Sequence, residues 1–477
     1  MTKLLPLFSV FALLATTAHA HVWQVGPTRM YTLPSQVAAL VSSGDTVEID
    51  AAAYDDCCTW SADNLLLRGV GGRPHLKNKT CSNKGIWILF GNNTTIENIE
   101  FSGAVSSDWN GAGVRAQGGS FTIRGCYIHH NQMGVLASMT DSANVLIEHS
   151  VFDANVSPNE SLFAHNIYIN TCDTFTLQYC YVHGAQVGHE VKSRAYVNFV
   201  LYNRITNEDD SASRDIDLPN GGQAYVIGNM IEKGPNADNT NTLGFGLEGM
   251  KNPGPQNLYV VNNTFVNDLP AKGIYFILPS SGFDTLLVKN NIFAGTGVLL
   301  NGSPSYIDST TNLFTSDIPS VGFVDHGHFN YHLTVGSPAI GAGSPAGFAR
   351  GFSLTPEFEY ADTANAVARV HLKSQPIAQG AYEYNGSEAV RSPSRPDAQL
   401  HAVYDRERSL IMIDLPPEAG LGSTVTVYDM LGHALAAIAA DGRTNITIPV
   451  ANIPSGLYFI RLVSPTSVLT TSLAVTR

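Results

Sequence analysis

Aromatic and charged residues recur at matching positions in consecutive short stretches of this chain. Tyr168, Lys192 and Asp217 each directly follow a β-branched residue in a stretch of alternating apolar and polar residues. If these stretches are neighbouring strands of a parallel sheet, their side chains lie about 4.8 Å apart in one column. A phenol, an amine and a carboxylate would then be close enough to bind a ligand and transfer protons.

Further polar residues flank this column. We expect Glu248 to extend it, and we expect two neighbouring columns, one of Asn166, Glu190 and Asp215 and one of Asn170 and Arg194. Three histidines, His165, His183 and His189, precede or follow the same strands. The loops 156–164 and 206–213 are long enough to wall a groove beside this face.

This set of groups suits β-elimination of a uronic-acid polysaccharide. Lys192 is the candidate base, provided that its surroundings lower its pKa. Arg194 can hold the sugar carboxylate with two parallel hydrogen bonds, and Tyr168 or His189 can protonate the leaving oxygen. Oxygen ligands suit calcium, which makes Glu190, Asp215 and Asp217 the candidate metal ligands. The remaining candidates are substrate-binding residues: Asn166, Asn170, His165, His183, Asp217 and Glu248.

Three other interpretations remain open. The cations can simply neutralise carboxylates on neighbouring strands. Asp215 and Asp217, about 7 Å apart along one strand, could serve an inverting glycoside hydrolase, although the Gly-His-Gly and Arg-Ile-Lys motifs of such β-helix enzymes are absent from the sequence. The face could also bind a glycan without cleaving it.

A short repeat indicates which elements position these residues. An apolar residue, a small or polar residue three positions later and an apolar residue two positions after that recur every 23 to 34 residues. This repeat predicts an all-β fold, a right-handed parallel β-helix with one repeat per coil. Copies are Ile96/Ile99/Phe101, Ile123/Cys126/Ile128, Ile147/Ser150/Phe152, Leu177/Cys180/Val182, Val200/Asn203/Ile205, Val226/Asn229/Ile231, Val260/Asn263/Phe265 and Val288/Asn291/Phe293.

The repeat also predicts the core. Asparagine at the middle position suits a left-handed corner and can form a hydrogen-bonded ladder. Strand alternation places Val114, Val135, Ile167, Val191, Ile216 and Ile274 inside. A short helix over 35–41 could cap the first coils, and residues 331–340 with 379–382 are expected to end the solenoid.

The two ends of the chain predict export. Residues 1–20 carry Lys3, an apolar run and Ala18-His19-Ala20, which is typical of a signal peptide. We expect the β-helix over 21–385, a linker over 386–400 and a small β-sandwich over 401–477. A net charge of −13 argues against nucleic acid, and no later segment predicts a membrane span. We expect a secreted monomer.

Export permits disulfides. The sequence contains six cysteines. Cys57 or Cys58 can pair with Cys81, and Cys172 can pair with Cys180.

The C-terminal segment resembles a known family. Tyr428-Asp429-Met430-Leu431-Gly432 and Ile453-Pro454-Ser455-Gly456-Leu457-Tyr458-Phe459-Ile460 are similar to the type A C-terminal sorting domain of the type IX secretion system. The resemblance implies a partnership with the outer-membrane secretion machinery.

The solenoid resembles the alginate lyase and chondroitin B lyase family, which has a pectin lyase-like fold. The resemblance rests on Glu190-Val191-Lys192-Ser193, followed by Asn198 and Asn203. It implies that Lys192 is the base, that calcium neutralises the uronate and that an arginine one coil further on is the acid. The next coil has Asp215-Ile216-Asp217-Leu218 at that place, so Arg214 is the nearest candidate.

Overall fold

A computed structural model gives the fold of the 477-residue chain. It describes residues 20–157, 163–371 and 376–384, and the C-terminal segments 401–405, 410–415, 423–428, 434–440, 443–449, 456–463 and 468–475. The expected signal peptide, except residue 20, and the expected linker lie outside these residues. The chain divides into two units, residues 1–385 and 386–477.

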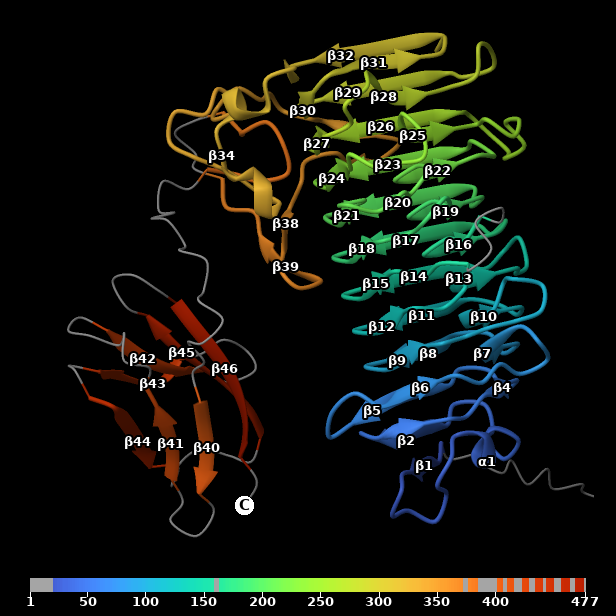
Figure 1. The fold of residues 1–477 in the computed structure, drawn as a ribbon, viewed down its shortest axis with the longest axis vertical. Coiled ribbons are helices and arrows are strands. Elements are labelled where there is room, and N and C mark those ends of the chain that lie inside the picture. The colour runs from blue at the N-terminus through green and yellow to red at the C-terminus, as the bar shows by residue number, and fades with distance from the viewer. Residues whose placement is uncertain are drawn as a thin grey trace, which may run out of the picture. The chain divides into compact units, whose positions relative to one another are not determined.

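The first unit is a parallel β-solenoid, which confirms the predicted fold (Figure 1). Each coil contributes one strand to each of three parallel sheets, named A, B and C here. Parallel pairing buries one face of every strand against the others, so the apolar repeat residues fill the interior.

Sheet A has twelve strands and sheet B has eleven. Sheet A consists of β1 (Val22–Val25), β2 (Thr46–Asp50), β5 (Leu66–Val70), β8 (Thr94–Glu97), β11 (Phe121–Arg124), β14 (Asn144–Glu148), β17 (Thr174–Gln178), β20 (Val197–Leu201), β23 (Gln223–Ile227), β26 (Asn257–Val261), β29 (Thr285–Lys289) and β32 (Tyr306–Thr310). Sheet B consists of β3 (Ala53–Tyr54), β6 (His75–Lys77), β9 (Glu100–Ser102), β12 (Tyr127–His129), β15 (Val151–Asp153), β18 (Tyr181–His183), β21 (Arg204–Thr206), β24 (Met230–Lys233), β27 (Thr264–Asn267), β30 (Ile292–Gly295) and β33 (Leu313–Thr315).

Sheet C has ten strands. They are β4 (Cys58–Trp60), β7 (Gly85–Leu89), β10 (Ala112–Ala116), β13 (Met133–Ala137), β16 (Ile167–Ile169), β19 (Val191–Ser193), β22 (Ile216–Leu218), β25 (Asn241–Phe245), β28 (Gly273–Ile277) and β31 (Gly297–Asn301). The predicted interior column of this sheet is buried from Val114 to Ile216 and continues through Leu243 to Phe276. Ile274 was wrongly expected there: it pairs with Asn241 and is half-buried.

The corner between sheets A and B carries the predicted asparagine ladder. Asn229 accepts hydrogen bonds from the backbone N–H of Asn203 at 2.9 Å and from its Nδ2 at 3.0 Å. In turn, Nδ2 of Asn229 donates to Oδ1 of Asn263 at 2.9 Å and to the Val200 carbonyl at 2.8 Å. The ladder continues through Asn291 to Asn312. These side chains satisfy corner backbone groups that no strand partner reaches.

The left-handed conformation does not belong to the ladder residue, contrary to the sequence-based expectation. The residue before it has the positive φ: 57° at Tyr202, 68° at Gly228, 52° at Asn262 and 58° at Asn290. The ladder asparagines are therefore retained for hydrogen bonding and not for backbone freedom.

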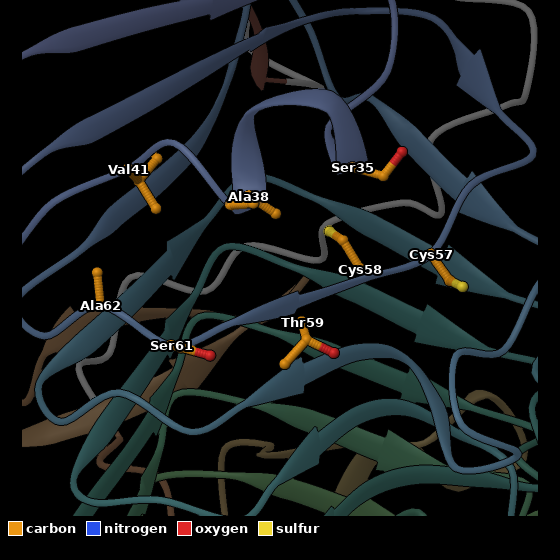
Figure 2. Close-up of a pocket in the computed structure, with 9 residues that line it drawn as sticks. Ser35, Ala38, Val41, Cys57, Cys58, Thr59, Ser61 and Ala62 are labelled. Carbon is orange, nitrogen blue, oxygen red and sulfur yellow. The ribbon is translucent and has the colours of Figure 1, made fainter.

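The N-terminal end of the solenoid carries the only described α-helix, α1 (Ser35–Ala38), which is shorter than expected. A hollow of about 410 Å³ lies beside α1 and is lined by Ser35, Ala38, Ala39, Val41, Cys57, Cys58, Thr59, Ser61 and Ala62. Figure 2 draws these lining residues as sticks. No charged side chain lines the hollow. The Cys57 and Cys58 side chains point in different directions there. Cys57 forms a disulfide with Cys81, and Cys58 is buried in the core.

The second expected disulfide is wrong. Cys172 and Cys180 are both free and buried. Cys180 occupies the ladder corner, where its N–H donates to Oδ1 of Asn203, whereas Cys172 lies in the core ahead of β17. The two thiols serve as small apolar side chains.

The segment after β33 does not simply end the solenoid, as residues 331–340 and 379–382 were expected to do. It packs alongside sheets A and B: Asn262 Nδ2 donates to the Ala378 carbonyl at 2.9 Å, and the Ala381 N–H donates to Thr264 Oγ1 at 3.0 Å. Its elements are η1 (Ile318–Val321), β34 (Phe323–Asp325), η2 (His326–His328), β35 (Asn330–Leu333), β36 (Phe348–Ala349), β37 (Phe352–Ser353), β38 (Phe358–Ala361) and β39 (Asn365–Ala368).

The second unit is a small antiparallel β-sandwich, as predicted. One sheet pairs β40 (His401–Asp405), β41 (Leu410–Asp414) and β44 (Asn445–Pro449), and the other pairs β43 (Ala434–Ala439), β42 (Thr424–Tyr428), β45 (Gly456–Val463) and β46 (Val468–Val475). Ile411, Ile446, Val425 and Ile460 belong to one buried cluster that joins the two sheets. Residues 429–432 and 453–455 of the sorting motifs lie outside the described residues.

The ladder generates the first prediction. Asn229→Ala leaves several buried polar groups of the adjoining coils without partners, each at a cost of about 1–3 kcal/mol. We expect a clear fall in the urea midpoint of the solenoid, measured by circular dichroism. Asn312→Ala, at the half-buried end of the ladder, serves as the control and should cost less. Equal losses at the two positions would contradict a cooperative ladder.

Candidate functional site

The column predicted from the sequence is present on sheet C. Tyr168 in β16 pairs with Lys192 in β19, and Lys192 pairs with Asp217 in β22. The Lys192 Nζ lies 3.5 Å from Asp217 Oδ2 and 5.5 Å from the centre of the Tyr168 ring. Strand register alone therefore brings the phenol, the amine and the carboxylate together.

Glu248 joins this group by a different route from the one expected. The column continues from Asp217 to Gly244, and Glu248 stands on the turn after β25. Its carboxylate nevertheless reaches back, with Oε1 2.9 Å from Lys192 Nζ and Oε2 2.6 Å from Arg194 Nη2. The Arg194 guanidinium also lies 5.0 Å from the centre of the Tyr168 ring.

The glycine at 244 leaves room for Arg214. A Cβ atom at this position would lie 2.8 Å from Asp217 Oδ1 and 2.9 Å from Arg214 Cδ. Arg214 uses the space to place Nη1 3.3 Å from Asp217 Oδ1. Its buried Nε has no hydrogen-bond partner among the described residues.

Two of the three candidate histidines, His165 and His189, lie next to Tyr168 and Asp217. His189 Nε2 is 3.4 Å from Asp217 Oδ2, while its Nδ1 accepts the Arg214 N–H at 3.1 Å. His165 Nδ1 accepts the His189 N–H at 2.8 Å, and the His165 ring stacks on that of His189. In each ring the lone pair on Nδ1 is occupied by a backbone N–H, which assigns the proton to Nε2. Both rings can donate a proton from Nε2 but offer no free lone pair.

His183 lies elsewhere. It belongs to β18 of sheet B, 3.7 Å from Asp153 and 3.8 Å from Glu208. The expectation that it stands beside Lys192 is wrong, because His183 belongs to a strand of sheet B and Lys192 belongs to a strand of sheet C.

The expected column of Asn166, Glu190 and Asp215 also differs from the prediction. All three side chains are fully buried at the corner before the sheet C strands. Asn166 Nδ2 and the Ala185 N–H donate to the Glu190 carboxyl group. Strand alternation does not hold at this corner, so these residues turn inward.

Asp215, one of the buried carboxyl groups, pairs with a cation supplied by the chain itself. Lys233 is fully buried, and its Nζ lies 3.6 Å from Asp215 Oδ2 and donates to the Ser213 carbonyl. A Lys233 ammonium ion takes the place that calcium would need, and Asp217 belongs to the exposed face. Glu190, Asp215 and Asp217 therefore do not fit one calcium site. The sequence pattern gave no reason to connect Lys233, at the end of a sheet B strand, with them.

Asn170 directly follows β16 as Arg194 directly follows β19, in the expected register, and its Nδ2 lies 3.4 Å from Ser138 Oγ. On the other side of Tyr168 the column runs through Leu136 to Arg115. Sequence reasoning missed Arg115, which the same register counting would have found. The loop residues 158–162 lie outside the described residues.

We name Tyr168, Lys192, Arg194, Arg214, Asp217 and Glu248 the Lys192 face. Its three cations exceed its two carboxylates, in a chain with a net charge of −13. Burial lowers the pKa of His165 to about 3, assisted by the charges of Lys192 and Arg194, so this ring adds no charge at neutral pH. The Lys192 face is therefore a local site of positive charge.

The two carboxylates of the face differ in environment. Burial raises the pKa of Asp217, against the charges of Arg214 and Lys192. Partial burial also favours protonation of Glu248, but hydrogen bonds from Arg194 and Lys192 outweigh it and lower its pKa to about 2. Glu248 is thus an ionised carboxylate, and its side chain is 40% exposed.

The buried corner generates the second prediction. Burial raises the pKa of Glu190 from 4.5 to about 8. The folded chain therefore holds more protons than the unfolded chain between about pH 4.5 and 8, and this group makes stability fall as pH rises through that window. The free energy of unfolding of Glu190→Gln should therefore exceed that of the parent by on the order of 1–4 kcal/mol between pH 5 and 8.

Urea unfolding at several pH values measures this difference. The control is Asp173→Asn, at an exposed position, which should shift stability equally at every pH. A difference between Glu190→Gln and the parent that stays constant with pH would show that Glu190 is ionised in the folded chain.

Comparisons with known proteins agree with the two units. Residues 55–229 match the family model of the right handed beta helix region, and residues 408–476 match that of the secretion system C-terminal sorting domain. No curated protein shows a significant match. Among solved structures, the crystal structure of pectate lyase Pel9A is similar, with a TM-score of 0.44 and 11% sequence identity over 76% of this chain and 96% of that chain.

None of the helices in the described part of the chain has the length and apolar character needed to cross a bilayer. The sorting-domain match confirms the predicted destination outside the cell or on its surface. The chain is a secreted protein that joins a right-handed parallel β-helix to a C-terminal sorting domain of the type IX secretion system.

Proposed function

We propose that the Lys192 face binds an acidic polysaccharide and cleaves it by β-elimination. The supporting observation is the position of Glu248, whose two carboxylate oxygens are held by Lys192 and Arg194 beside the Tyr168 ring. A uronate carboxylate has the same charge and geometry. Glu248 thus marks where the substrate carboxylate would bind, with the flat Tyr168 ring available to a sugar face.

Lys192 takes the role of the base once the substrate carboxylate has replaced the Glu248 carboxylate. In the free protein two carboxylates, Asp217 and Glu248, stabilise the Lys192 ammonium ion. When Glu248 swings away on its turn, the uronate carboxylate binds Arg194 in its place. Lys192 acts as the base in its neutral amine form, beside the Arg194 and Arg214 cations.

The neutral Lys192 amine then removes the proton from C5 of the uronate. The electron pair of the C5–H bond forms the C4–C5 double bond, and the C4–O bond breaks with its electron pair on the leaving oxygen. Tyr168 or the Nε2–H of His165 donates the proton that this oxygen takes. Arg194 and Arg214 stabilise the negative charge that develops on the sugar carboxylate.

The structure does not favour Asp215 and Asp217 as the carboxyl pair of a glycoside hydrolase. That chemistry needs two carboxyl groups that both face the sugar. Asp217 lies at the Lys192 face, but Asp215 is fully buried next to Lys233.

The third prediction concerns Lys192. Lys192→Ala should lower the rate of unsaturated uronate formation by about 10²–10⁴-fold, the usual contribution of a general base. The assay follows the ultraviolet absorbance of the double bond on a panel of uronate polysaccharides, with and without EDTA. We expect EDTA to leave activity unchanged, since arginines rather than calcium neutralise the carboxylate.

Lys289→Ala on sheet A is the matched control and should retain parental activity. New reducing ends without ultraviolet absorbance would identify a hydrolase. Retention of glycans by the parent without cleavage would identify a binding protein. Full lyase activity in Lys192→Ala would remove Lys192 from the mechanism.

The fourth prediction concerns Glu248. Because Glu248 competes for the carboxylate position, Glu248→Ala should bind a uronate trisaccharide up to about fivefold more tightly, since a partly exposed ion pair contributes up to about 1 kcal/mol. Calorimetry of Lys192→Ala with and without the second substitution measures this without turnover. Weaker binding would instead make Glu248 a direct substrate ligand.

A further inference from the structure

A second polar cluster lies on sheet B, in the N-terminal half of the solenoid. His75 in β6 pairs with Glu100 in β9, and His129 stands in β12, two residues beyond the partner of Glu100. The three side chains are 27%, 25% and 15% exposed, respectively. They belong to three successive coils and are separate from the Lys192 face on sheet C.

Two of the three distances between the potential ligand atoms are close to those around a tetrahedral ion. Glu100 Oε1 lies 3.1 Å from His129 Nε2 and 3.5 Å from His75 Nδ1. All three ligand atoms lie within 4.8 Å of one another. Ligand bonds of about 2.0–2.1 Å around a tetrahedral zinc ion separate neighbouring ligand atoms by about 3.3 Å. Only a small adjustment of the two imidazoles would bring the set onto one ion.

The second nitrogen of each imidazole has a partner, as in protein metal sites. His75 Nε2 is 2.6 Å from Ser102 Oγ, so this nitrogen can carry the proton and leave Nδ1 free to coordinate. His129 Nδ1 is 2.9 Å from His130 Nδ1, which leaves Nε2 free in the same way. The His129 ring also stacks on Tyr127, with ring centres 4.1 Å apart. These contacts fix both rings before any ion arrives.

We propose that His75, Glu100 and His129 bind a zinc-type divalent cation. Two neutral imidazoles and one carboxylate are the donor set that zinc prefers over calcium or magnesium, which take oxygen ligands. Three protein ligands leave a fourth coordination position, and the partial exposure of the cluster makes that position accessible to water. The ion would link three successive coils of sheet B.

The alternative is that the two imidazoles only hydrogen-bond to Glu100. One imidazole would then have to place its proton on the nitrogen that faces Glu100. Metal binding requires that the nitrogen facing Glu100 carries no proton, whereas a hydrogen bond to Glu100 requires that it carries one. The two arrangements therefore respond differently to substitution of the residues that contact the second nitrogen of each ring.

The experiment measures metal affinity of the full chain. The protein is treated with EDTA, exchanged into chelator-free buffer and titrated with Zn²⁺ against a chromophoric chelator. We expect one tight site, which His129→Gln and His75→Gln should each weaken by about 100-fold or more. Ser102→Ala, which removes only a residue behind His75, should weaken binding by about 10–100-fold. Titration with Co²⁺ should give the visible absorption of a four-coordinate ion in the parent and not in His129→Gln or His75→Gln.

His183→Gln is the matched control. His183 lies in the same outward column two coils further on, stacks on Tyr181 as His129 stacks on Tyr127, and faces Asp153 and Glu208. It should leave zinc affinity unchanged. Circular dichroism establishes that each variant is folded, and Glu100→Gln replaces any variant that is not.

Three results would overturn the proposal. One is the absence of a tight site in the parent. Another is equal affinity in the parent, His129→Gln and Glu100→Gln. Loss of binding in His183→Gln to the same extent as in His129→Gln would also overturn it, since the ion would then bind elsewhere on sheet B.

Discussion

The parallel hydrogen-bond register is the constraint on which the rest of this structure depends. It stacks each residue on its counterpart in the preceding coil at the interstrand spacing of about 4.8 Å. Inside, this stacking produces apolar columns such as Val135, Ile167 and Val191. At the corner it produces the asparagine ladder. Outside, it gathers side chains that are about 25 residues apart in sequence, so the solenoid can assemble a site without any loop closing over it.

The strand register explains which side chains lie close together, while burial decides which charge each of them carries. Lys192 and Lys233 show the difference. Lys192 stands on the outer face between two carboxylates, where a ligand can replace one of them. Lys233 is fully buried next to Asp215, so burial lowers its pKa, although the charges of Asp215 and Glu190 oppose this effect. The same residue type thus has the proposed functional position on the outer face and a structural position in the interior.

The sequence predicted those parts of the molecule that follow strand periodicity. The coils, the interior column and the Tyr168–Lys192–Asp217 column all follow from alternation and repeat spacing. The errors fall where periodicity ends. Glu190 and Asp215 stand at a corner, where alternation no longer decides which side chains face inward. Glu248 follows a long connection, which shifts the register by four residues and places Gly244 in the column. No local pattern reports the Lys233 contact, which joins two sheets.

The outward face of sheet A shows why the open sites belong to sheets B and C. Tyr225 and Tyr259 stack there and Tyr202 stands at the corner after β20, and such aromatic rings would suit a sugar chain if they were exposed. The segment after the last coil covers them instead: Phe352 packs against Tyr225 and Phe358 against Tyr202, which leaves the three tyrosines no more than 8% exposed. The segment after β33 thus covers this apolar outer face. The polar columns of sheet C and of the first coils of sheet B keep half-exposed charged groups, and these are the surfaces on which an acidic sugar or a metal ion can be bound.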